Sequence, residues 1–262
     1  MNDLLDAVLA DLATEGDRLD SLVAGLSEEG WRTPTPAAGW DVATQVAHLA
    51  WTDEAALAAA TDKPAWDELV LQVLADPTGY VDATALAGGA VPPADLLARW
   101  RSGRADLAAA LRAVPEVTKL PWYGPPMSPA SMATARLMET WAHALDVHHA
   151  LDAEPEATDR IRHIARLGVR TRDFSFAANG LDVPSDEFRV ELTAPSGDLW
   201  SWGPEGAGQS VRGSAHDFCL LVTQRIHRDD TDLVAQGRDA TAWLSMAQSF
   251  AGPPGEGRQA GG

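Results

Sequence analysis

The chain is organised around residues 128–151, SPASMATARLMETWAHALDVHHAL, which combine a helical apolar pattern with ionisable side chains. Ser128 followed by Pro129 is typical of a helix N-cap and first helical position, and neither Gly nor Pro interrupts residues 130–151. Glu139 and His143 are four residues apart, so a helix presents both from one face. The sequence therefore predicts a helix that carries a carboxylate and an imidazole side by side, next to a separate apolar stripe.

A carboxylate and an imidazole on one face are two potential ligands of a metal ion, and a third must come from elsewhere. The best candidate is His48, in the middle of a second predicted helix, GWDVATQVAHLAWTDEAAL, that Asp41 can cap. Two imidazoles and one carboxylate leave a coordination position open, as in catalytic sites for zinc or another divalent metal. Spacing alone leaves an alternative open, because Glu and His pairs arise by chance on many helices and a lone His in an apolar helix is commonly a hydrogen-bonded core residue.

Two short segments around these residues resemble the signatures of a known family. PTPAAGWDV at residues 34–42, followed by AHLA at 47–50, resembles the N-terminal signature of the mycothiol-dependent maleylpyruvate isomerase family. ETWAHALDV at residues 139–147 resembles the second signature of that family. The resemblance extends over nearly the whole chain, including residues 121–143 and SFAGPPG near the end, and is closest to an actinobacterial branch described only as metal-binding proteins.

This resemblance implies a fold and a set of residue roles. The family belongs to the DinB-like metal-binding four-helix bundles, in which the matching residues bind a divalent metal, typically zinc; those residues are His48, Glu139 and His143 here. It also implies mycothiol, or another low-molecular-weight thiol, as a cofactor. Arg225, in VTQR, loosely resembles an Arg that contributes to the family's active site from the C-terminal domain; an exposed Arg at a helix end is the competing interpretation. Asp146 is a candidate for orienting a ligand histidine or a bound water, with a solvated helix carboxylate as its alternative.

The pattern of elements predicts two domains. Four substantial amphipathic helices up to Leu151 predict a helical bundle over residues 1–152. Beyond it the pattern changes: a helix is followed by alternation in FRVELTA and LWSWG, separated by the turn residues 195–197, and helical patterns resume at about residues 215–227 and 240–250. The predicted fold class is therefore a mixed one, a four-helix bundle followed by a smaller α+β domain over residues 153–262.

Composition limits the classes of partner. A formal net charge of -18 argues against nucleic acid and against anionic membrane surfaces as partners. The chain contains neither an apolar run of membrane-spanning length nor the features of a signal peptide, so we expect it in the cytoplasm. Its single cysteine, Cys219, excludes an internal disulfide and a Cys-x-x-Cys motif. A thiol that takes part in catalysis is therefore expected to arrive as a cofactor.

These observations predict a divalent-metal-dependent enzyme of the thiol-dependent isomerase or S-transferase type. The metal would favour the thiolate, which would attack an electrophilic carbon of a small, electrophilic or acidic metabolite. Two alternatives use the same residues: a protein that binds a metal or ligand without turnover, and a hydrolase or lyase with metal-activated water. We further expect Arg225 to lie at a cleft between the two domains and to bind an anionic group there.

Overall fold

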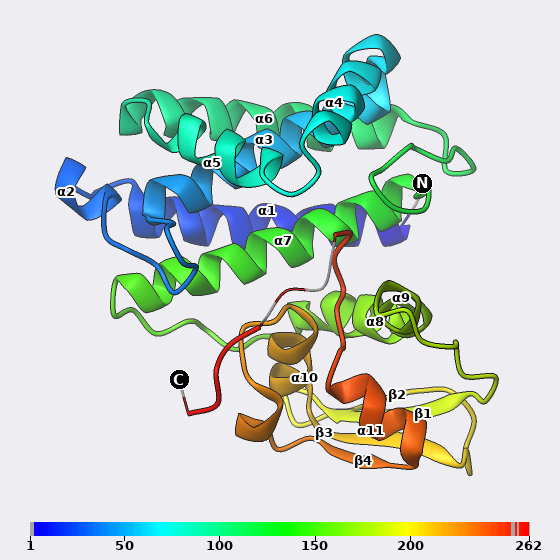
Figure 1. The fold of residues 1–262 in the computed structure, drawn as a ribbon. Coiled ribbons are helices and arrows are strands. Elements are labelled where there is room, and N and C mark those ends of the chain that lie inside the picture. The colour runs from blue at the N-terminus through cyan, green and yellow to red at the C-terminus, as the bar shows by residue number, and fades with distance from the viewer. Residues whose placement is uncertain (1–2, 253–254, 256, 262) are drawn as a thin grey trace. The chain divides into compact units, whose positions relative to one another are not determined.

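The computed structural model describes residues 3–252, 255 and 257–261, and the chain forms two compact units, Met1–Pro155 and Glu156–Gly262 (Figure 1). The proline pair 253–254 in the quoted SFAGPPG stretch lies outside the described residues. Among the helices of the described part, none has the length and apolar character needed to cross a membrane.

The first unit is helical throughout. Its helices are α1 (Asp3–Val23), α2 (Glu28–Trp31), α3 (Val42–Thr61), α4 (Lys63–Ala75), α5 (Tyr80–Gly89), α6 (Pro93–Ala113) and α7 (Pro129–Ala150). The four long helices α1, α3, α6 and α7 form the bundle: α3 packs against α6 and α7, and α1 packs against α7 (Figure 1). Ser128 caps α7, because its hydroxyl oxygen accepts a hydrogen bond from the Ser131 backbone N–H at 3.2 Å. The predicted four-helix bundle is confirmed.

Helix α3 is the central element of this unit. Every residue from Val42 to Asp53 is buried, because α5, α6 and α7 all pack against this helix. Asp41 caps its start by accepting the Thr44 N–H at 2.8 Å. Apolar residues of α3 share a core with Trp31, Trp100 and Val147, and burying each large side chain of this kind contributes about 1.5–3 kcal/mol. His48, in the middle of α3, is consequently buried, at 8% exposure.

A buried ion pair connects the two helices that carry the candidate ligands. Nε of Arg136 on α7 donates to Oδ1 of Asp53 on α3 at 2.9 Å, and the two side chains are 1% and 3% exposed. Burial raises the pKa of the Asp53 carboxyl, and the attraction of Arg136 only partly opposes that effect. The pair therefore fixes one contact between α3 and α7 without contact with solvent.

The second unit combines helices with a small sheet. Its elements are η1 (Asp159–Ile161), α8 (Arg162–Arg170), α9 (Arg172–Ala178), β1 (Phe188–Thr193), β2 (Leu199–Trp202), β3 (Gln209–Ser214), α10 (Ala215–Val222), η2 (Arg228–Asp230), β4 (Val234–Gln236) and α11 (Arg238–Leu244). The strand order is β2-β1-β3-β4, with β1 antiparallel to β2 and parallel to β3, and with β3 antiparallel to β4. Helices α10 and α11 pack on the sheet, where Phe218, Phe188 and Trp243 form edge-to-face ring contacts. The predicted α+β fold class is confirmed.

Several predicted element boundaries in this unit are wrong. The helix expected over residues 215–227 ends at Val222, because Gln224 adopts a left-handed φ of 58° and the Arg225 N–H bonds back to Leu220 O at 2.7 Å. The helix expected over residues 240–250 is α11, which ends at Leu244. The following backbone bonds elsewhere: the Ser249 N–H donates to Val222 O at 2.8 Å. Strands β3 and β4 were not predicted, because β3 has a single large apolar side chain, Val211, and β4 has only three residues.

Candidate metal centre

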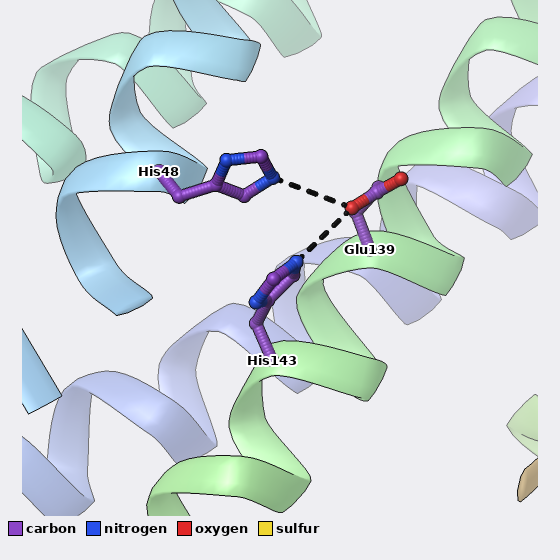
Figure 2. Close-up of side chains that lie close together, drawn as sticks. All are labelled: His48, Glu139 and His143. Atoms are coloured by element: carbon purple, nitrogen blue, oxygen red, sulfur yellow. Dashed lines mark ion pairs between the residues drawn. The ribbon is translucent and has the colours of Figure 1, made fainter. Parts of the chain in front are cut away.

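Helices α3 and α7 bring three predicted ligands together. Figure 2 shows His48 extending from α3 toward Glu139 and His143, which both extend from α7. The Oε2 atom of Glu139 lies 3.6 Å from Nε2 of His48 and 3.3 Å from Nε2 of His143. One potential ligand atom of each residue lies within 4.8 Å of the others. His48 and two residues that follow it by 91 and 95 positions in the sequence thus present two imidazole nitrogens and a carboxylate oxygen to one point.

These separations can be compared with the geometry of a bound metal. Ligand atoms at about 2.1 Å from one tetrahedral zinc ion lie about 3.4 Å from one another. Two of the three separations, 3.3 and 3.6 Å from the carboxylate oxygen to the imidazole nitrogens, agree with that value, and all three ligand atoms lie within 4.8 Å of one another. The donor set of two imidazoles and one carboxylate is one that zinc and related divalent ions accept, and it leaves a coordination position open. The residues therefore fit a divalent metal.

The charge state of the cluster suits a cation. Burial raises the pKa of the Glu139 carboxyl, but hydrogen bonding and attraction from the His143 and His48 imidazoles outweigh burial, so its pKa lies well below the usual range. Glu139 is therefore ionised at neutral pH. Its side chain is 22% exposed, against 10% for His48 and 12% for His143, so the carboxylate is the most accessible of the three.

Aromatic rings surround the two histidines. The Trp40 ring lies 5.3 Å from the His48 ring and stacks on the His143 ring at 5.9 Å. It is held in place by Nε1, which donates to Asp82 Oδ1 on α5 at 3.1 Å. The Trp51 ring also lies near His48, at 5.9 Å. With these rings beside them, the His48 and His143 side chains are only 10% and 12% exposed, and electrostatic interactions are stronger at such poorly solvated positions.

Three tryptophans that lie close in sequence to the candidate ligands, Trp51, Trp122 and Trp141, differ in their contacts. Trp51 does contact His48. Trp122 stacks on Trp66 and contacts Tyr123, whose ring in turn packs against that of Trp51. Trp141 is buried on α7. The aromatic wall therefore continues from His48 toward the segment that precedes α7.

Sequence reasoning assigned no role to two residues that contact the ligands. Trp40 lies within the quoted signature, yet its contact with both imidazoles follows from the turn at Gly39, which has a φ of 79°. Gln45 lies on α3, one turn before His48, and its Oε1 is 2.5 Å from Nδ1 of His143. The sequence feature that could have indicated a role for Gln45 is a polar amide in the mostly apolar stretch 42–51, three residues before His48.

The structure also locates the other candidate residues, Asp146 and Arg225. Asp146 is buried on α7, one turn after His143, and its orienting role stays a prediction. Arg225 lies in the second unit, just after α10, where its Nη1 donates to Thr223 O at 2.7 Å; its role and its place at a cleft also stay predictions. Of the two neighbouring histidines, His148 contacts Ala153 O through Nδ1 at 3.2 Å, and His149 is exposed.

The fold and the cluster define a class: a helical bundle with a possible three-ligand metal site between facing helices, joined to a small α+β unit. The family described as the mycothiol maleylpyruvate isomerase N-terminal domain matches residues 12–148, which include all three candidate ligands. The chain therefore belongs to the mycothiol maleylpyruvate isomerase family. A second family, described as wyosine base formation, matches residues 184–236 in the α+β unit.

Similar proteins and structures agree with this assignment. Uncharacterised proteins from two strains of Mycobacterium tuberculosis are each 56% identical over 250 residues, covering 95% of this chain and 97% of theirs. The crystal structure of a mycothiol-dependent maleylpyruvate isomerase is similar with a TM-score of 0.59 at 16% identity, covering 88% of this chain and 92% of that one. A histidine-to-alanine variant of that isomerase gives the same values. This similarity in structure shows that the fold is shared.

Proposed function

We propose that this protein is a divalent-metal-dependent enzyme that uses a low-molecular-weight thiol, mycothiol or a related compound, to isomerise or conjugate a small electrophilic metabolite. The observation that carries the proposal is the convergence of His48, Glu139 and His143, whose ligand atoms lie within 4.8 Å of one another. These residues lie in the part of the chain that matches the mycothiol maleylpyruvate isomerase family. The family name supports the thiol and the isomerase chemistry, and the donor set supports the metal.

In this proposal the three residues of the cluster hold the metal, with zinc as the ion that fits the donor set best. A divalent ion in such a site lowers the pKa of a thiol at its open position and so supplies a thiolate nucleophile near neutral pH. Glu139 brings a negative charge to the site, because its pKa lies well below the usual range. Trp40 and Trp51 limit the access of water, which favours attack by a thiol over attack by hydroxide.

Two further residues have proposed roles outside this cluster. The guanidinium of Arg225 is suited to bind a carboxylate of the substrate or of the thiol, because it offers planar, charge-assisted donors. Asp146, buried one turn after His143, is suited to orient a ligand or a bound water. The thiol itself must come from outside the chain, since the buried Cys219 has a pKa raised by burial.

The test is a reaction that depends on both metal and thiol. Metal-free protein, protein reconstituted with zinc, and reconstituted His143→Ala are incubated with maleylpyruvate and mycothiol, and cis to trans conversion is followed together with the free thiol concentration. Conversion by the zinc-loaded wild type, without loss of thiol, identifies an isomerase. Loss of thiol with formation of a thioether identifies an S-transferase.

Two outcomes contradict the proposal. Equal turnover by the zinc-loaded wild type and by His143→Ala would separate the activity from the cluster. If zinc raises the melting temperature but no member of a panel of electrophiles reacts with the thiol, the cluster binds metal without turnover.

A further inference from the structure

Gln45 connects the cluster to the loop that precedes α3. Its side chain is fully buried, at 0% exposure. Its Oε1 lies 2.5 Å from Nδ1 of His143, and its Nε2 donates to Thr35 Oγ1 at 2.9 Å. The Thr35 hydroxyl in turn donates to Trp40 O at 3.0 Å. Four groups thus form a continuous hydrogen-bonded chain from a backbone carbonyl to a predicted ligand.

The direction of every hydrogen bond in this series follows from the Trp40 carbonyl. The Trp40 carbonyl can only accept, so the single proton of the Thr35 hydroxyl is used on that carbonyl. The same hydroxyl oxygen must then accept from Gln45, which places the amide NH₂ toward Thr35 and the amide oxygen toward His143. An amide oxygen can only accept, so Nδ1 of His143 carries a proton. In the neutral imidazole, Nε2 is then the unprotonated nitrogen.

That nitrogen is the one directed at the cluster. Nε2 of His143 lies 3.3 Å from Glu139 Oε2, to which it donates when it is protonated; as a metal ligand it must instead present its lone pair. His48 differs, because its buried Nδ1 has no hydrogen-bond partner among the residues that the structure describes. Gln45 thus acts on only one of the two imidazoles.

We propose that Gln45 is a positioning residue, which fixes His143 in the Nδ1–H tautomer and holds its Nε2 lone pair toward the metal position. The effect of Gln45 on metal affinity rests on the proposed metal-binding function. The tautomer of His143, in contrast, is a property of the metal-free protein. Partners of this kind behind a ligating histidine alter metal affinity by about 10–100-fold when they are removed.

The first experiment determines the tautomer directly. Nitrogen-15 NMR of the imidazole groups is recorded on the metal-free full chain, at a pH where His143 is neutral, with His143→Gln used to assign its resonances. We expect the proton on Nδ1 in the wild type. A proton on Nε2 of His143 overturns the proposal, whatever the protein does with metal.

The second experiment measures zinc affinity by competition with a chelator. Gln45→Leu removes the acceptor at similar volume, and Gln45→Glu keeps an acceptor oxygen. We expect zinc affinity to fall by about 10–100-fold in Gln45→Leu and to be largely retained in Gln45→Glu. Thr35→Val, at a half-buried position, removes only the anchor of the amide and is expected to weaken binding less than Gln45→Leu does.

A matched control separates positioning from general damage. Gln248 is another buried glutamine, 1% exposed, whose amide donates to the carbonyls of Phe250 and Gly252 in the second unit. Gln248→Leu should lower the melting temperature without changing zinc affinity or the His143 tautomer. Wild-type zinc affinity in a folded Gln45→Leu contradicts the proposal. If Gln45→Leu fails to fold, Thr35→Val and the wild-type tautomer decide it.

The proposed function and this inference fail in different ways. If the wild type binds no divalent metal, the proposed function fails, while the tautomer measurement still decides the role of Gln45. If the wild type binds zinc and Gln45→Leu binds it equally well, the proposed function stands and the positioning role is rejected.

Discussion

Breaking the buried pair between Asp53 and Arg136 should destabilise the bundle strongly. Asp53→Ala removes the carboxylate and leaves the Arg136 guanidinium without its counter-charge, with only 1% of the side chain exposed. Uncompensated buried charges of this kind cost about 3–5 kcal/mol. The exposed pair Lys63–Asp67, with side chains 79% and 53% exposed, provides the matched control, and Asp67→Ala should cost less than about 1 kcal/mol.

A double replacement should recover most of this loss. The pKa of Asp53 is raised because burial outweighs the attraction of Arg136, so the charged pair stabilises the bundle little relative to apolar side chains of similar volume. We therefore expect Asp53→Leu combined with Arg136→Met to be close to the wild type in stability and far more stable than Asp53→Ala.

Urea unfolding of the metal-free full chain, followed by far-ultraviolet circular dichroism, measures these differences, because most of the helices belong to the bundle. The chelator in the buffer removes any contribution of bound metal to stability. A loss in Asp53→Ala no larger than in Asp67→Ala would refute the reasoning, since it would show that the guanidinium is solvated without its partner.

Three further predictions concern other parts of the chain. The pKa of Asp20 is lowered, chiefly because Arg101 donates two hydrogen bonds to it, at 2.5 and 2.7 Å. The ionised Asp20 therefore stabilises the fold above about pH 4, and this stabilisation is lost as the pH falls through the lowered pKa of the folded state. In Asp20→Asn the melting temperature should consequently fall less steeply toward acid pH than in the wild type. An unchanged dependence of the melting temperature on pH contradicts this. Cys219 is fully buried and its pKa is raised by burial, so a thiol reagent should modify it only after unfolding, and rapid modification of the native chain contradicts this. Arg225→Ala should leave metal content unchanged but weaken binding of an acidic ligand by about 1–3 kcal/mol, measured by calorimetry; unchanged affinity contradicts its proposed role.

The sequence predicted those parts of the fold that depend on local pattern. The helix at residues 128–151 was predicted within one residue, because Ser128 and Pro129 fix its start and a helical apolar pattern follows. Its Glu139 and His143 share a face through helical spacing alone. Strands β3 and β4 were missed because β3, with Val211 as its one large apolar side chain, shows no alternation and β4 has only three residues, and because their pairing depends on residues far away in the sequence.

Of the candidate site, the sequence indicated only the three candidate ligands. Asp146 could be placed one turn after His143 from helical spacing, but the role of a buried carboxylate depends on its neighbours. The contact between Gln45 and His143 joins residues 98 positions apart, so no spacing within one helix indicates it. Trp40 contacts both imidazoles because the chain turns at Gly39, before α3. The amino-acid sequence alone does not specify the backbone conformation at this glycine.

The central claim is that His48, Glu139 and His143 hold one divalent metal, and metal content tests it most directly. Wild-type protein, His48→Ala, Glu139→Ala and His143→Ala are purified without chelator and analysed by inductively coupled plasma mass spectrometry. His149→Ala, at an exposed histidine on the same helix, is the control. We expect close to one divalent ion per chain in the wild type and in His149→Ala, and loss of most of it in each of the other three variants. One ion per chain in all of the variants would show that His48, Glu139 and His143 do not hold the metal.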